Sequence, residues 1–115
     1  MCQRFSTAFN AKDLNAQMAF YTDDATQMSP EEGMIVGTEA RKKFFTDADK
    51  VISHHHCHCT NAAQIDNDAT SAAGTWDATI ATDKGPQTIG SYYSVVLVGA
   101  LPNAKVVLET WNNKP

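Results

Sequence analysis

The sequence predicts an α+β fold in which three helices come first and a mostly antiparallel sheet follows. Apolar residues recur at close to helical spacing in the first part of the chain, for example at Leu14, Met18 and Tyr21. From Ser53 onward the pattern changes to a period of two, which is typical of strands. Four long strand segments joined by short turns form an antiparallel meander, so helices and strands are segregated along the chain.

The first two predicted helices are short and close together in the chain. Phe5 and Phe9 are spaced to share one face of the first helix. Asp13 is the expected N-cap of the second helix, because its carboxylate can accept hydrogen bonds from the first turn. This helix is expected to end near residues 22–24, and a short strand is expected over residues 25–28.

A third amphipathic helix is expected after a loop that contains a possible edge strand over residues 34–36. Thr38 is the expected N-cap of this helix, and Glu39 adds a negative charge where the helix dipole favours one. Its apolar face is expected to consist of residues at helical spacing: Ala40, Phe44, Ala48 and Val51.

The four long strands are predicted over residues 53–65, 69–81, 87–98 and 105–112. The second has the cleanest alternation, which indicates one buried and one solvated face. Its apolar face holds Ala72, Gly74, Trp76, Ala78 and Ile80, and its polar face holds Ser71, Thr75, Asp77 and Thr79.

Length, charge and cysteine content restrict the classes of function. Residues 1–115 fit one domain that can bury a core of its own. The net charge of −4 argues against nucleic-acid binding, which needs a cationic surface. No apolar run is long enough to span a membrane, and the first residues lack the apolar core of a signal peptide. The three cysteines are interpreted as reduced thiols, which favours a cytoplasmic protein.

Five stretches of the chain together resemble a known family. They are NAKDL at residues 10–14, AFYTDDAT at 19–26, GTW at 74–76, GSYYSVV at 90–96 and ETWN at 109–112. Their order and spacing resemble the SnoaL-like and ketosteroid-isomerase-like branch of the nuclear transport factor 2-like superfamily. The resemblance implies a cone-shaped α+β barrel, in which three N-terminal helices pack on a strongly curved, mostly antiparallel sheet.

Such a fold has a concave interior that either fills with side chains or holds a small ligand. We expect large side chains to line a pocket for a small molecule there. The candidates are Tyr21, Met28, Phe45, Trp76, Tyr92 and Trp111.

The most unusual stretch runs from His54 to Cys59. On a strand, the three even-numbered histidines share one face, and His55 shares the other face with both cysteines. In dehydratase-like relatives a histidine at the start of this strand acts as acid or base, and His54 or His56 matches that position. However, Ile65 is in phase with His55, so the His55 face is the buried one unless a bulge shifts the register.

The same histidines and cysteines are natural zinc ligands, but a complete site needs further ligands from another strand. Asp77 or Glu109 could approach, yet neither is an obvious partner, so no metal and no cofactor are predicted.

The motifs of well-known family members are incomplete in this chain. Ser29 stands where ketosteroid isomerases have an aspartate as general base, and a serine takes no proton at neutral pH. Phe5 stands where those enzymes have a donor tyrosine. Phe9 and Asn10 replace the Tyr-Asp pair of scytalone-dehydratase-like members. Neither of these two reactions is therefore expected by its usual constellation.

Two functions stay open. In the first, the chain is a small-molecule pocket protein that acts as a lyase, isomerase or hydrolase on a small apolar or aromatic molecule. His54 or His56 would be its acid or base, and Tyr92 or Tyr21 its hydrogen-bond donor. In the second, the chain is a non-catalytic binding or dimerisation module, in which the outer face of the sheet pairs two copies. A homodimer is expected.

Overall fold

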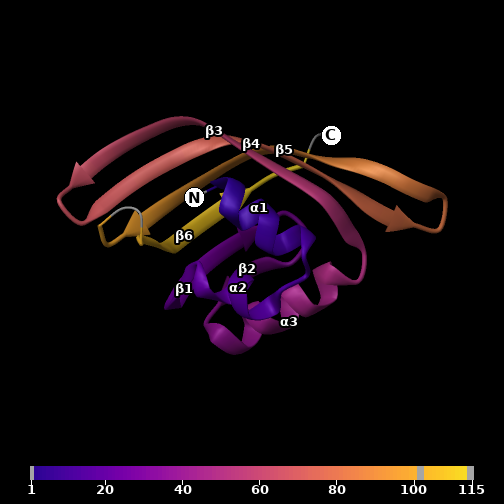
Figure 1. Ribbon diagram of the computed structural model, residues 1–115. Helices are drawn as coiled ribbons and strands as arrows, with labels where there is room; N and C mark the ends of the chain where they lie inside the picture. The colour runs from indigo at the N-terminus through magenta and orange to yellow at the C-terminus, as the bar shows by residue number, and fades with distance from the viewer. Residues whose placement is uncertain (1, 101–102, 114–115) are drawn as a thin grey trace.

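A computed structural model describes residues 2–100 and 103–113. In this part of the chain, three helices and two strands come before residue 50, and the other four strands follow (Figure 1). The elements are α1 (Cys2–Asn10), α2 (Leu14–Ala19), β1 (Tyr21–Ser29), β2 (Gly33–Val36), α3 (Thr38–Asp49), β3 (Ile52–Asp66), β4 (Ala69–Thr82), β5 (Gly85–Val98) and β6 (Lys105–Trp111). The predicted α+β class and the four long strands are confirmed.

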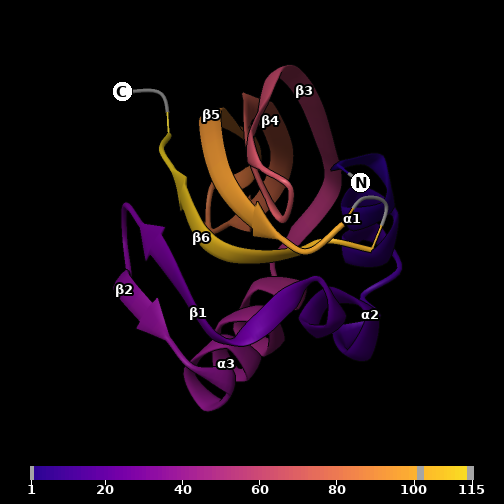
Figure 2. The ribbon, with the colours of Figure 1, turned by 90° about the vertical axis from the view of Figure 1, so that its left-hand side faces the viewer.

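The strands form one curved sheet in the order β2-β1-β6-β5-β4-β3. All neighbouring pairs are antiparallel except β1 and β6, which run parallel. Within the described residues the sheet is open, with β2 and β3 at its edges. Strands β3, β4 and β5 arch over the helices, so the helices lie on the inner side of the curve (Figures 1 and 2).

Two glycines and two bulges let the long strands bend. A Cβ at Gly74 would lie 1.8 Å from the carbonyl oxygen of His58, and one at Gly90 would lie 2.1 Å from that of Trp76. Both positions therefore require glycine, because neighbouring backbones pass too close for a side chain. The register of β3 against β4 also shifts between Ser53 and His56 and again after Cys59, as bulges in a bent strand do.

The second helix ends earlier than the sequence predicts. Strand β1 begins at Tyr21, where the prediction still had helix. Tyr21 is 3 % exposed, pairs with Val106 of β6, and donates from its hydroxyl to Glu109 at 2.7 Å. These partners lie 85 or more residues further along the chain, and their pairing outweighs the local helical spacing.

Helix starts follow local chemistry more closely. Asp13 caps α2 as predicted, since its Oδ1 accepts from the N–H of Ala16 at 3.1 Å. The predicted cap of α3 is wrong by one residue, because Gly37 occupies the N-cap position. The hydroxyl of Thr38 instead donates to the carbonyl of Asp23 at 3.5 Å. The edge strand predicted over residues 34–36 is present as β2.

The prediction of three reduced cysteines is wrong. Cys2 of α1 and Cys57 of β3 form a disulfide with a Cα–Cα distance of 5.6 Å, and Cys59 is free. The sequence analysis considered Cys57 only with its neighbour Cys59, whereas its partner lies 55 residues away. The disulfide also removes the thiol-based reason for a cytoplasmic location. No helix among the described residues is both long and apolar enough to cross a membrane.

Candidate ligand cavity

The inner face of the sheet and the helices surround a cavity of about 1060 Å³. A cavity of this size is large enough for a small organic molecule. Strands β3 to β6 contribute one wall, and aromatic side chains of α1 and α3 contribute the other, among them Phe5, Phe9, Phe44 and Phe45. These two walls leave a recess between the sheet and the helices.

Four of the six predicted lining residues are on the cavity wall: Tyr21, Phe45, Trp76 and Trp111. The other two, Met28 and Tyr92, are placed wrongly by the prediction. Both lie on the outer face of the sheet, where Met28 is 40 % and Tyr92 65 % exposed. Side chains alternate along a strand, so Gln27 and Tyr93 face the cavity beside them.

A bulge decides which histidine faces inward. His54 has a φ of 54°, and two residues of β3 stand opposite Ala78 of β4 where regular pairing has one. His55 consequently turns inward and is only 8 % exposed. His54 is exposed, and His56 points outward with its Nδ1 3.4 Å from Asp77. Neither of these two predicted acid–base residues lines the cavity, whereas His55 does.

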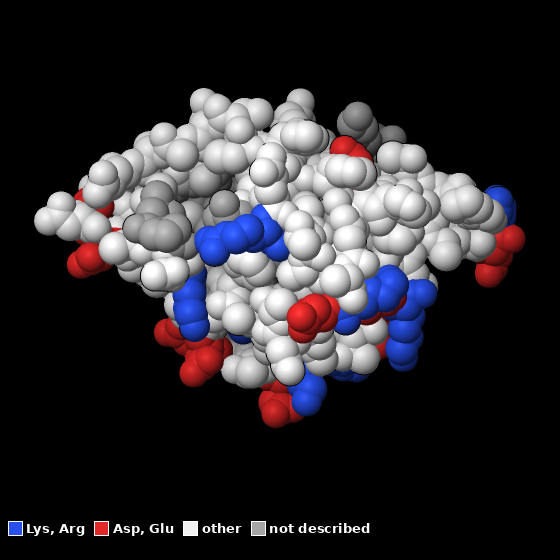
Figure 3. Space-filling model, viewed as in Figure 1, with Lys and Arg blue, Asp and Glu red and all other residues white. Residues whose placement is uncertain are grey.

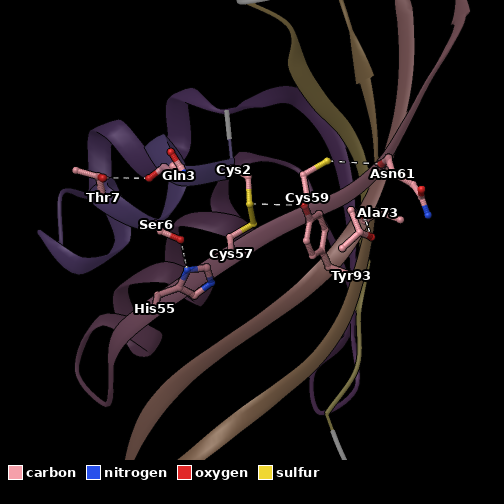
Figure 4. Close-up of a disulfide and its surroundings, with 11 residues drawn as sticks. Cys2, Gln3, Ser6, Thr7, His55, Cys57, Cys59, Asn61, Ala73 and Tyr93 are labelled. Atoms are coloured by element: carbon pink, nitrogen blue, oxygen red, sulfur yellow. Dashed lines mark hydrogen bonds between the residues drawn. A yellow bond between two sulfur atoms is a disulfide. The ribbon is translucent and has the colours of Figure 1, made fainter.

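The ring of His55 is held on both faces and at one edge. It stacks on Phe9 at 4.9 Å between ring centroids and on Trp76 at 6.0 Å. Its Nδ1 lies 2.8 Å from the hydroxyl oxygen of Ser6 (Figure 4). The Asn10 side chain fixes the backbone, since its Oδ1 accepts from the His55 N–H at 2.7 Å and its Nδ2 donates to the His55 carbonyl at 2.9 Å.

These contacts keep the imidazole neutral and in one orientation. Burial lowers the pKa of His55 to about 4, although the charge of Asp77 acts in the opposite direction. At neutral pH the ring therefore carries one proton. If the Ser6 hydroxyl donates to Nδ1, that proton is on Nε2, which becomes a hydrogen-bond donor.

The second polar group of the cavity is Glu109 of β6. Its Oε1 accepts hydrogen bonds from Tyr21 Oη at 2.7 Å and from Gln27 Nε2 at 3.0 Å. Neither bond uses Oε2, and Glu109 lies on the cavity wall. Arg41 supports the arrangement from behind, where its Nε donates to Gln27 Oε1 at 3.1 Å and its guanidinium lies 5.0 Å from the Tyr21 ring centroid.

The surroundings favour the protonated form of the Glu109 carboxyl. Burial raises the pKa of Glu109, and the hydrogen bonds from Tyr21 and Gln27 and the charge of Arg41 lower it by less. The pKa of Tyr21 is raised well above its ordinary value by burial and by the neighbouring Glu109. A carboxyl group with a raised pKa in an apolar cavity is suited to giving and taking protons.

Glu109, Gln27 and His55 were not among the pocket or acid–base residues expected from the sequence. Glu109 could have been found, because it is two residues before Trp111 and therefore on the same face of β6. For His55, the phase with Ile65 already indicated a buried face, and the bulge at His54 explains how Ile52 and His55 both line the cavity. Among the described residues, no group of three or more His, Cys, Asp or Glu is placed to hold a metal ion.

Comparison with known proteins agrees with this architecture. A family model described as "SnoaL-like domain" matches residues 2–107. A ketosteroid isomerase-like protein from Erwinia carotovora atroseptica has a similar structure, with 17% identity, coverage of 98% of this chain and 91% of that chain, and a TM-score of 0.84.

Two further solved structures are similar. A conserved protein from Planctomyces limnophilus is 11% identical, with coverage of 98% of this chain and 90% of that chain and a TM-score of 0.82. An NTF-2 like protein of unknown function from Shewanella oneidensis is 14% identical, with coverage of 94% and 89% and a TM-score of 0.73. No curated protein matches the chain. Because the family model spans nearly the whole chain, this protein belongs to the SnoaL-like domain family, and its fold is NTF2-like.

Proposed function

We propose that the cavity binds a small, largely apolar or aromatic molecule and that the protein acts on it as an isomerase or lyase. The observation that carries this proposal is the carboxyl of Glu109 on the wall of the cavity. One of its oxygens is held by Tyr21 and Gln27, and the other accepts no hydrogen bond from the described residues. The SnoaL-like family and the ketosteroid isomerase-like neighbour support this class of function. Fold alone does not establish it.

In this proposal Glu109 is the proton acceptor. It removes a proton from a carbon beside a substrate carbonyl, and the electron pair moves onto the carbonyl oxygen. The same proton then returns to a second atom in an isomerase, or a leaving group departs in a lyase. A carboxylate with a raised pKa is a stronger base than an ordinary one. Its pKa is also closer to neutral pH, where proton transfer in both directions is efficient.

His55 takes the place that the sequence analysis gave to His54 and His56. As a neutral imidazole on the same cavity it can donate a hydrogen bond from Nε2 to the oxygen that becomes negative. Ser6 and Asn10 hold the ring and the backbone of this residue. Tyr21 remains a hydrogen-bond donor, but its hydroxyl donates to the carboxyl of Glu109, so in this proposal it acts on the substrate through Glu109.

The proposal is tested with 2-tetralone, a small aromatic ketone with acidic C–H groups. We expect the protein to accelerate exchange of these protons for deuterium, measured by proton NMR in deuterated buffer. Glu109→Gln keeps the shape but cannot accept the proton, so exchange should fall roughly 100-fold. The matched control is Glu39→Gln, which changes an exposed residue of α3 that does not line the cavity.

A second pair of variants separates the histidines. We expect His55→Gln to slow the exchange and His54→Gln to leave it unchanged. Exchange at the buffer rate with the unmodified protein, or equal rates in the Glu109→Gln and control variants, would contradict the proposed function.

We also propose that two copies associate through the outer face of the sheet. This face carries half-exposed apolar side chains at Met28 and Leu108, next to Val96 on a shallow depression. On the side of the molecule in view in Figure 3, charged side chains gather over the helices and at the two hairpin tips. Exposed apolar patches of this kind mark contact surfaces.

A further inference from the structure

The charged side chains on the cavity wall are mostly acidic. Five ionisable carboxyl or ammonium groups line it: Glu31, Glu32, Lys43, Asp47 and Glu109. The Lys43 ammonium lies 2.8 Å from Asp47 Oδ2, so the lining cation already has an anionic partner. Among the described residues, the remaining three carboxyl groups of the wall form no salt bridge. Because burial favours the protonated form of Glu109, the negative charge that the wall presents to a ligand comes from Glu31 and Glu32.

One of these carboxylates is linked to the chain segment that carries Trp111. Glu31 accepts a hydrogen bond from Asn113, two residues after Trp111 of the cavity wall. The Trp111 ring lies 5.5 Å from that of Phe44, which also lines the cavity. Carboxylates next to aromatic faces form the environment that stabilises an ammonium group, because both attract a positive charge.

The nearby guanidinium of Arg41 acts on Glu109 through its charge but does not line the cavity. Arg41 is 1 % exposed and is not part of the cavity lining. Its nitrogens donate to the backbone carbonyls of Thr22 and Ala25 and to the side chain of Gln27. A ligand carboxylate in the cavity would thus meet the Glu109 carboxyl without reaching the guanidinium.

We propose that the cavity selects small aromatic amines in their ammonium form over aromatic carboxylates of the same size. The inference rests on the proposed function, since it names the class of molecule that the same cavity takes. The aromatic part would pack on the ring-lined wall, and the ammonium would face the carboxyl groups.

The test uses three naphthalene probes that differ in charge but hardly in size. They are 2-(aminomethyl)naphthalene, 2-naphthalenemethanol and 2-naphthoate, with binding measured by calorimetry at neutral pH. We expect the amine to bind most tightly, the alcohol less tightly and the carboxylate least, with roughly tenfold or more between the extremes at low salt. High salt should narrow the gap, because screening acts on the exposed charges.

Variants locate the source of the preference. The double change Glu31→Gln with Glu32→Gln should weaken amine binding about threefold or more and leave the alcohol unchanged. Glu39→Gln removes one negative charge from a residue outside the cavity and serves as the control. The glutamine at position 31 can still accept the bond from Asn113, so the loop keeps its anchor.

The outcomes separate this inference from the proposed function. If the alcohol binds but the carboxylate binds as well as the amine, the charge preference is wrong and the cavity remains a ligand site. If none of the three probes binds, both proposals fail. An amine preference that survives the double change unaltered also overturns the inference, because the acidic wall would not be its cause.

Discussion

The imidazole of His55 shows how one residue makes stability depend on pH. Its pKa is about 4 in the folded chain and 6.5 when unperturbed, so the unfolded chain binds more protons between these values. The contribution of His55 to the unfolding free energy is therefore fully present above pH 6.5 and is lost as the pH falls toward about 4. The carboxyl of Glu109 acts in the opposite sense, because its raised pKa favours the folded chain at lower pH.

We predict that His55→Gln removes this pH dependence. Between about pH 7.5 and about pH 5, the unmodified protein should lose about 2 kcal/mol more unfolding free energy than the His55→Gln variant. Urea unfolding of both proteins at both pH values measures these losses. Subtracting the loss of the variant from that of the unmodified protein cancels the contribution of Glu109, which both proteins contain. His54→Gln is the matched control, since His54 is exposed and should leave the loss unchanged. Equal losses in the unmodified and His55→Gln proteins would contradict the burial of this ring.

At the scale of elements, the disulfide fastens the first turn of α1 to β3. A helix of nine residues is marginal by itself, so its attachments hold it in place. Asn10 and Ser6 fasten the later turns to His55, whereas Cys2 is bonded at the first residue. The link also closes a loop across a sequence separation of 55, which limits the freedom of the unfolded chain.

We predict that Cys2→Ser lowers the unfolding free energy by about 4 kcal/mol, while Cys59→Ser changes it little. Urea unfolding without reductant measures both. Thiol titration of the denatured chain gives an independent check, because one free thiol is expected before reduction and three afterwards. Three thiols before reduction would show that the link is absent.

Gly74 provides a sharp test of how the sheet bends. In the folded chain a Cβ at this position would lie 1.8 Å from the His58 carbonyl oxygen, which belongs to rigid backbone. We expect Gly74→Ala to destabilise the protein by roughly 1–3 kcal/mol or more, because β3 and β4 must separate. Thr75→Ala, on the adjacent residue and the opposite face, is the control. Equal thermal stability of the two variants would mean that the strands do not pass this closely.

Elements that depend on local chemistry could be predicted, and those that depend on distant partners could not. The alternation in β4 and the turns beside it gave bounds within a few residues of the observed Ala69–Thr82. Tyr21 was assigned to a helix because its strand partners, Val106 and Glu109, are far away in sequence. Four cavity residues were expected from size and spacing, and the phase with Ile65 indicated the His55 face. The bulge at His54, which reverses the phase before it, is not visible in the periodicity.

At the scale of the whole molecule, the cavity and the proposed dimer contact lie on opposite faces of the sheet. The inner face and the helices surround the cavity, so contacts between copies through the outer face leave the cavity wall unchanged. The outer face carries Leu108 at 36 % exposure, opposite Val96 in the sheet. Burying such side chains against a second copy removes apolar surface from water, which favours association.

We therefore predict a homodimer, with a mass by light scattering of about twice the 12.5 kDa of one chain. Leu108→Glu places a charge in the proposed contact and should yield monomers, because an unpaired buried charge opposes association. Thr88→Glu adds the same charge to an exposed residue of β5 outside the depression and should remain dimeric. Binding of 2-naphthalenemethanol should persist in the Leu108→Glu monomer, since Leu108 does not line the cavity. A monomeric unmodified protein at high concentration, or a dimer that tolerates Leu108→Glu, would exclude this face as the contact.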